Sequence, residues 1–156
     1  MPHITVVEGD LLDQQVDVIV NAWNRNPLPW WLMILSGVSR AIHKRAGSAP
    51  FRELAAMPLI PLGGAVLTGP GKLAFQAIIH VAGINLLWTA SERSIHDSVV
   101  HAIALAKTHG FESIALPLIG AGAGGGSMAH VQSVIEAALA TCEYDGRVVI
   151  VRYTPR

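Results

Sequence analysis

The sequence predicts an α/β fold, namely a three-layer α/β/α sandwich around a mixed, mostly parallel central sheet. Two observations lead to this prediction. Segments rich in β-branched residues alternate along the chain with segments of helical periodicity. The 156 residues suit one domain, and 51% of them are hydrophobic against 14% charged, which fits a large buried core. We therefore expect residues 1–156 to form a single domain.

Strands are predicted where β-branched and other apolar residues cluster between turn residues. These segments are HITVV (3–7), VDVIV (16–20), GGAVLTG (63–69), QAIIHVAG (76–83), SIALPLIG (113–120) and RVVIVRY (147–153). His80, inside the fourth segment, is expected to be a hydrogen-bonded histidine of the core. The order of the strands in the sheet does not follow from this pattern.

Helices are predicted where apolar residues recur at helical spacing. Ser36 is the expected cap of a first helix that ends at Gly47, a second covers 92–109, and Ser127 starts a third. The predicted apolar faces are Val38, Ala41 and Ile42 in the first helix, Ile95, Val99, Ile103 and Ala106 in the second, and Val131, Ile135, Ala138 and Cys142 in the third.

Composition argues against several classes of protein. The chain has no uninterrupted apolar run of about 18 residues, so we expect no membrane span. Its N-terminus does not resemble a signal peptide. The formal net charge of zero argues against a dominant role in nucleic-acid binding. The single cysteine, Cys142, fits a reducing cytoplasm. The spacing of histidines and cysteine gives no metal-ligand set, so we expect neither a metal nor a cofactor.

The strongest sign of a ligand site is the segment GAGAGGGS (120–127), which lies between a predicted buried strand and a predicted helix. Its glycines allow a close approach of the backbone to a ligand, and its N–H groups could hold an anion such as a diphosphate. The alternative is a flexible surface loop. The start of the helix at Gly37 is a second candidate for an anion site, or else an ordinary capped helix.

Polar residues also follow other predicted strands, as expected where ligands bind beyond the carboxyl ends of parallel strands. Asp10 could accept a hydrogen bond from an exocyclic amine such as adenine N6, or cap a turn. Asn21 and Asn24 could bond ribose hydroxyls, or tie down a loop. Tyr153 could stack on a base, or serve only as a strand residue.

Taken in this order, the segments resemble the macrodomain family of ADP-ribose-binding and Appr-1''-p-processing modules. The resemblance, to a divergent bacterial-type member, spans roughly residues 3–153. The matching segments are EGDLL, VDVIVNAWN, GVSRAIHKRAG, GGAVLT, AIIHVAG and SIALPLIGAGAGGG. The resemblance implies the macrodomain fold and a cleft for ADP-ribose, or for an ADP-ribosyl group on a protein or nucleic acid.

The resemblance also implies roles for individual residues. It places Asp10 at the adenine amine, with the Leu11 amide beside it, and Tyr153 near the adenine. It assigns Asn24 to the distal ribose and makes it the candidate catalytic residue. The implied diphosphate-binding residues are Ser36, Gly37, Val38 and Ser39 on one side, and Gly120, Ala121, Gly122, Ala123 and Gly124 on the other.

The sequence departs from the family pattern at several positions. Ser39 stands where the hydrolytic branch of the family has an acidic residue. A hydroxyl supplies no negative charge at neutral pH. Gly124 stands where the family has an aromatic residue, in the glycine-rich loop 120–127. Trp23 replaces a small residue, and the segment PLPWWLMIL (27–35) lengthens the loop after Asn24.

Trp30 or Trp31 could therefore form a lid that replaces the packing lost at Gly124. The alternative is that Trp23, Trp30 and Trp31 pack on the domain or bury a dimer patch.

Three functions remain open from the sequence. The first is a non-catalytic reader of ADP-ribose or of an ADP-ribosylated partner. The second is an ADP-ribosyl hydrolase, in which the substrate's own diphosphate could activate a water positioned by Asn24. The third is a divergent macrodomain for another nucleotide or an RNA end. The oligomeric state does not follow from the sequence.

Overall fold

The computed structural model describes residues 2–23, 37–83, 91–119 and 127–153. Its described strands form one sheet in the order β1-β6-β5-β2-β4-β3. Their bounds are β1 His3–Gly9, β2 Val18–Ala22, β3 Ala65–Thr68, β4 Ala77–Val81, β5 Ser113–Pro117 and β6 Arg147–Tyr153. Neighbouring strands run parallel except for β3, which is antiparallel to β4. The predicted mixed, mostly parallel sheet is confirmed.

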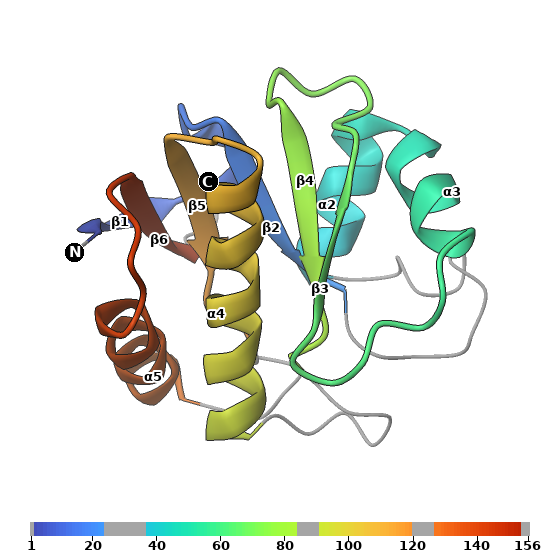
Figure 1. Ribbon diagram of the computed structural model, residues 1–156. Coiled ribbons are helices and arrows are strands. Elements are labelled where there is room, and N and C mark those ends of the chain that lie inside the picture. Colours follow the sequence, from blue (N-terminus) through green and yellow to red (C-terminus); the bar gives the residue numbers. More distant parts are fainter. Residues whose placement is uncertain (1, 24–36, 84–90, 120–126, 154–156) are drawn as a thin grey trace.

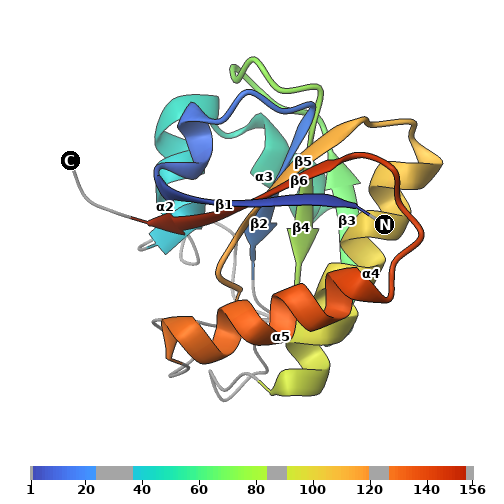
Figure 2. The ribbon, with the colours of Figure 1, turned by 90° about the vertical axis from the view of Figure 1, so that its left-hand side faces the viewer.

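Helices cover both faces of the sheet (Figure 1 and Figure 2). Their bounds are η1 Leu11–Asp13, α2 Gly37–Ala46, α3 Ala49–Ala55, α4 Glu92–Thr108 and α5 Met128–Ala140. Helices α4 and α5 pack on one face, whereas η1, α2 and α3 pack on the other. This arrangement is the predicted three-layer sandwich.

Each face of the sheet has its own apolar core. In β2, Val18 and Val20 contribute to the core under α4 and α5, while Ile19 contributes to the core under α2 and α3. All three side chains have no exposed surface. Successive side chains of a strand point to opposite faces, and both faces are covered here. This explains why the central strands appear as continuous apolar runs in the sequence.

The second strand begins two residues later than predicted, at Val18 rather than Val16. Asp17 explains the difference, because its carboxylate is used in a turn. Oδ2 accepts from the backbone N–H of Glu112 at 2.8 Å, and Oδ1 accepts from Nε2 of Gln76 at 3.1 Å. The Asp17 backbone N–H also donates to Oγ of Ser113 at 2.8 Å. These bonds join the start of β2 to the starts of β4 and β5.

The predicted helix faces are confirmed for α4 and need correction in the other two helices. In α2, Ala41 is exposed and Ala46 is buried instead, because Val38, Ile42 and Ala46 are spaced four residues apart on one side. Helix α5 ends at Ala140, so Cys142 lies beyond it. Cys142 is still half-buried against the core, and burial raises the pKa of its thiol.

The sequence prediction missed α3, which is seven residues long. Pro50 lies in its first turn, and Phe51 and Leu54 are buried three residues apart. Proline at the start of a helix is a recognised signal, because its missing N–H has no helical partner to lose there. The helix is too short for periodicity to reveal it.

Serine caps fix the starts of α4 and α5. Ser91 and Ser94 form a reciprocal capping box at α4, and Ser127 accepts a hydrogen bond from the N–H of His130 at α5. Ser94 Oγ also donates to the carbonyl of Gly83 at 2.8 Å, which joins α4 to the chain just after β4. None of the described helices has the length and apolar character needed to cross a membrane.

Candidate functional site

The parallel strands all end at the same edge of the sheet, which we call the carboxyl edge. Their last residues are Gly9, Ala22, Val81, Pro117 and Tyr153. Ligands of open α/β sheets bind beyond this edge, at the point where the strand order changes direction. In this chain that point lies between the neighbouring strands β2 and β5.

The connections that follow β2 and β5 lead to opposite faces of the sheet. The chain after β2 continues to α2 on one face, and the chain after β5 continues to α5 on the other. The predicted diphosphate-binding residues Gly37, Val38 and Ser39 form the first turn of α2. Asn24, Ser36, Gly120, Ala121, Gly122, Ala123 and Gly124 lie outside the described residues, as do Trp30 and Trp31.

The structure brings together the residues that the resemblance assigns to adenine. Gly9 pairs with Tyr153 at the ends of β1 and β6, and Asp10 and Leu11 follow directly. Tyr153 is 67% exposed, so its ring is available to a ligand. Oδ1 of Asp10 caps η1 by accepting from the N–H of Leu12 at 2.9 Å. The described residues provide no partner for Oδ2.

Asn21 and Ser39 bond to each other rather than standing open to solvent. Ser39 Oγ donates to Oδ1 of Asn21 at 2.9 Å, and Nδ2 of Asn21 donates to Nδ1 of His80 at 3.0 Å. Asn21 and His80 have no exposed surface, and Ser39 has 6%. Asn21 therefore lies beneath the first turn of α2, as part of the structure that holds this turn on the sheet.

His80 is a hydrogen-bonded core residue, as the sequence predicts. Its Nε2 lies 2.8 Å from Oγ1 of Thr68, and its ring meets Phe51 edge-on with centroids 6.2 Å apart. Complete burial lowers the pKa of the ring to about 3, so the imidazole is neutral at physiological pH. A neutral ring has one donor and one acceptor, which matches its two partners.

Trp23 packs on the domain, which is one of the two roles considered for it. Its ring lies 5.3 Å from that of Phe51, centroid to centroid, in the core under α2 and α3. Its backbone N–H donates to the carbonyl of Val81 at 2.9 Å, so the chain beyond β2 still follows β4. These contacts fix the last described residue after β2 against β4 and the core under α2 and α3.

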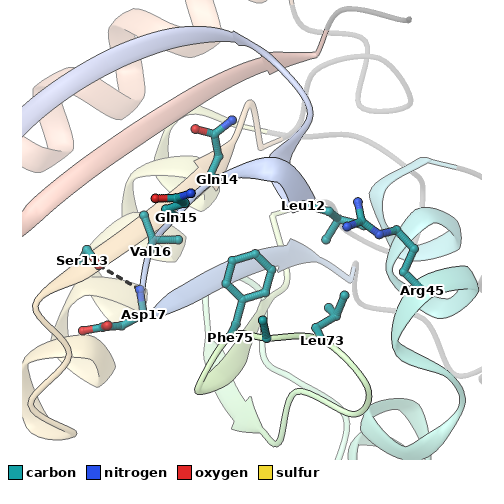
Figure 3. Close-up of a pocket in the computed structure, with 10 residues that line it drawn as sticks. Leu12, Gln14, Gln15, Val16, Asp17, Arg45, Leu73, Phe75 and Ser113 are labelled. Carbon is teal, nitrogen blue, oxygen red and sulfur yellow. Dashed lines mark hydrogen bonds between the residues drawn. The ribbon is translucent and has the colours of Figure 1, made fainter.

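A pocket of about 340 Å³ lies at the opposite edge of the sheet, where the strands begin (Figure 3). Leu12, Val16, Leu73 and Phe75 form its apolar lining, and Asp17 and Arg45 are among its charged residues. The Asp17 carboxylate is already bonded to Glu112 and Gln76, and Arg45 lies 3.5 Å from Asp13. The charged side chains of this pocket are therefore already paired with other residues of the protein.

The described residues contain no group of histidine, cysteine and acidic side chains that could hold a metal. They do contain a hydrogen-bond partner of His80 that the sequence prediction missed, Thr68. A signal for this partner existed. Asn21, His80 and Thr68 are polar residues at fully buried strand positions, and buried polar groups normally bond to one another. Their pairing could not be derived without the strand order.

Comparison with known proteins agrees with this geometry. The family model described as "Macro domain" matches residues 20–135. The O-acetyl-ADP-ribose deacetylase of Escherichia fergusonii is 36% identical over 128 residues, which are 77% of this chain and 68% of the relative. A macro domain-containing protein of Streptomyces griseus is 38% identical over 129 residues, 78% of this chain and 70% of the relative.

Solved structures lead to the same conclusion. A macrodomain variant of Oceanobacillus iheyensis, solved with ADPR, superposes with a TM-score of 0.83 at 25% identity. The match covers 98% of this chain and 86% of that one. The family model, the sequence relatives and the superposition therefore agree, and this chain belongs to the macro domain family.

Proposed function

We propose that this protein binds ADP-ribose, free or attached to a protein or nucleic acid, at the carboxyl edge of its sheet. The observation that carries the proposal is the divergence of the chain after β2 and β5, at the change in strand order of a macro domain. The solved relative with ADPR supports the choice of ligand.

Residues at the ends of β1 and β6 suit the adenine end of the ligand. The exposed ring of Tyr153 offers a stacking surface, and it adjoins Gly9, which precedes Asp10. The Oδ2 atom of Asp10 can accept a hydrogen bond from the adenine amine while Oδ1 remains on Leu12. The Leu11 amide is the neighbouring candidate donor.

The first turn of α2 suits the diphosphate. Gly37, Val38 and Ser39 begin this helix, and the first N–H groups of a helix have no partner within it. Such groups favour an anion without needing a cationic side chain. We propose that the glycine-rich residues from Gly120 to Gly124 supply further N–H groups from the β5 side, and that Asn24 binds the distal ribose.

The substitution Asp10→Asn tests the adenine contact. Asparagine retains an oxygen for the Leu12 cap but replaces the second oxygen with an NH2 group, which opposes the adenine amine. We expect the affinity for ADP-ribose to fall about tenfold to a hundredfold, the usual range for a lost charge-assisted hydrogen bond. Isothermal titration calorimetry measures the change, with Asp13→Asn as the control of equal charge change.

The same titration tests the whole proposal in the unmodified protein. ADP-ribose should bind more tightly than AMP, because AMP lacks the second phosphate and the distal ribose. Equal affinity for the two ligands would instead favour the third function, a macrodomain for another nucleotide or an RNA end.

Hydrolysis of O-acetyl-ADP-ribose is a second candidate, because two of the sequence relatives are O-acetyl-ADP-ribose deacetylases. In this reaction water adds to the acetyl carbonyl, and the products are acetate and ADP-ribose. Ser39 is not suited to act as the base, because it is buried and its hydroxyl donates to Asn21. For this candidate we propose that the substrate's own diphosphate activates the water and that Asn24 positions it.

Incubation with O-acetyl-ADP-ribose and with mono-ADP-ribosylated protein separates a hydrolase from a reader. Release of acetate or ADP-ribose, lost in Asn24→Ala, would identify a hydrolase. Tight binding without release would identify a reader. The single cysteine supports the further proposal of a reducing, cytoplasmic location.

A further inference from the structure

Four buried side chains form an unbroken chain of hydrogen bonds across one face of the sheet. Ser39 bonds to Asn21 at 2.9 Å and Asn21 to His80 at 3.0 Å. His80 then bonds to Thr68 at 2.8 Å, and Thr68 donates to the carbonyl of Gly69 at 3.0 Å. We call this set, Ser39–Asn21–His80–Thr68, the relay. None of its members is more than 6% exposed.

The chemistry of the groups gives the relay one direction. The amide nitrogen of Asn21 can only donate, so Nδ1 of His80 accepts from it. A neutral ring then carries its proton on Nε2, which donates to Oγ1 of Thr68. The Thr68 hydroxyl donates a hydrogen bond to the carbonyl of Gly69, and the Ser39 hydroxyl donates to Oδ1 of Asn21. Each of these donors therefore has its own acceptor.

The relay joins the first turn of α2 to three strands. Ser39 belongs to α2, whereas Asn21, His80 and Thr68 belong to β2, β4 and β3. The other contacts of α2 with the sheet include the apolar side chains of Ile42 and Ala46. Apolar packing is not directional, so it permits small rotations and shifts of a helix. A hydrogen bond is directional and fixes the height and rotation of the turn.

The relay also determines what Ser39 can offer to a ligand. Its proton is committed to Asn21, so the hydroxyl has only lone pairs left for another partner. Ser39 can neither donate to a phosphate oxygen nor supply a charge while the relay is intact. Its contribution to binding is to hold the N–H groups of its own helical turn in place.

We propose that the relay is a positioning device that presents the first turn of α2 to the diphosphate of the ligand. This inference rests on the proposed binding of ADP-ribose. It makes Ser39, Asn21, His80 and Thr68 positioning residues, whose side chains set the affinity for a diphosphate ligand without touching it.

Calorimetry on single variants tests the proposal. Ser39→Ala should weaken ADP-ribose binding about tenfold, since the turn loses its hydrogen bond to Asn21. AMP affinity should change by less than about twofold, because the adenosine end of the ligand binds at β1 and β6 instead. Ser39→Thr keeps the hydroxyl and should restore binding of ADP-ribose.

Ser98→Ala is the matched control. Ser98 is also a fully buried serine, on α4, but its hydroxyl has no hydrogen-bond partner among the described residues. Removing that hydroxyl should leave ADP-ribose affinity unchanged. A loss in Ser98→Ala equal to that in Ser39→Ala would show a general effect of core substitution and overturn the proposal.

The far end of the relay gives a sharper test. Thr68→Val removes the hydroxyl that accepts from His80, two side chains away from Ser39. It should also weaken ADP-ribose binding, and the double variant Ser39→Ala/Thr68→Val should lose less than the two single losses multiplied together. If the losses of affinity multiply in the double variant, or if Thr68→Val binds ADP-ribose as tightly as the unmodified protein, the relay is contradicted.

Nuclear magnetic resonance tests the direction of the relay without any ligand. Long-range ¹H–¹⁵N correlation spectra of the unmodified protein should show the His80 proton on Nε2 at neutral pH. A proton on Nδ1, or on both nitrogens, would overturn the assignment.

Two failures remain distinguishable. If the unmodified protein binds no ADP-ribose, the proposed function is wrong, and with it the role of the relay in affinity. If the unmodified protein binds and Ser39→Ala binds equally well, the function stands and the positioning role is wrong.

Discussion

Polar residues in the middle of an apolar sheet are the most informative single residues of this protein. Asn21, His80 and Thr68 occupy buried strand positions where the neighbouring sequence is aliphatic. Each such residue loses its hydration on folding, and only a complete set of partners offsets that loss. The hydrogen bonds among them therefore indicate that these three positions hold neighbouring elements in a fixed geometry, and do not serve only to bury apolar surface.

His80 should make the stability of the protein depend on pH. Burial lowers the pKa of its ring from 6.5 to about 3. Below pH 6.5 the unfolded chain takes up a proton that the folded protein excludes until about pH 3. The free energy of unfolding should therefore fall by about 1.4 kcal/mol per pH unit as the pH is lowered through this window.

Urea unfolding at a series of pH values measures this dependence. The variant His80→Gln cannot take up a proton at this position, so its stability should fall less steeply with acid. Equal slopes in the two proteins would show that His80 is not the group excluded from protonation.

At the scale of elements, close contacts between strand ends shape the carboxyl edge. Gly83 follows β4 and is buried, and a Cβ atom at this position would overlap Cγ2 of Ile119, which follows β5. The Gly83 carbonyl also accepts from Ser94 in the first turn of α4. The ends of β4, β5 and α4 therefore meet at a position where only glycine fits without a shift.

Gly83→Ala should destabilise the protein by about 2 kcal/mol, because overpacking forces neighbouring side chains or backbone to move. Thermal or urea unfolding measures the loss. Gly69→Ala is a suitable control, since the nearest atoms to its added Cβ belong to the flexible, exposed side chain of Glu53 at 3.3 Å. Similar losses in both variants would mean that the contact with Ile119 is not the cause.

The sequence predicted most elements because both faces of the sheet are covered, which leaves long apolar segments and clear helical periods. It missed α3, whose seven residues are too few to show a period. It placed Ala41 on the buried side of α2, whereas Ala41 is exposed and Ile42 and Ala46 are buried there. The partners of Asn21 depend on strand order, which no local pattern contains.

The whole molecule has no excess of either charge. It contains 11 lysine and arginine residues and 11 aspartate and glutamate residues, so any attraction to a diphosphate must be local. The first turn of α2 supplies N–H dipoles rather than full charges at the proposed site. This balance distinguishes the proposed site from one that collects phosphates with a basic surface.

Binding of ADP-ribose should accordingly depend weakly on salt. We expect its affinity to fall less than about threefold between about 50 mM and about 500 mM sodium chloride, because screening acts mainly on full charges. Calorimetry at several salt concentrations measures this slope. A steep loss of affinity would assign the diphosphate to lysine or arginine side chains.

The divergence of the chain after β2 and β5 has a mechanical consequence. One path leads to the helices on one face of the sheet and the other to the helices on the opposite face. A nucleotide bound between the two paths would contact both layers and link them. Heat would then have to melt both layers together, and a bound nucleotide would raise the single melting temperature of the domain.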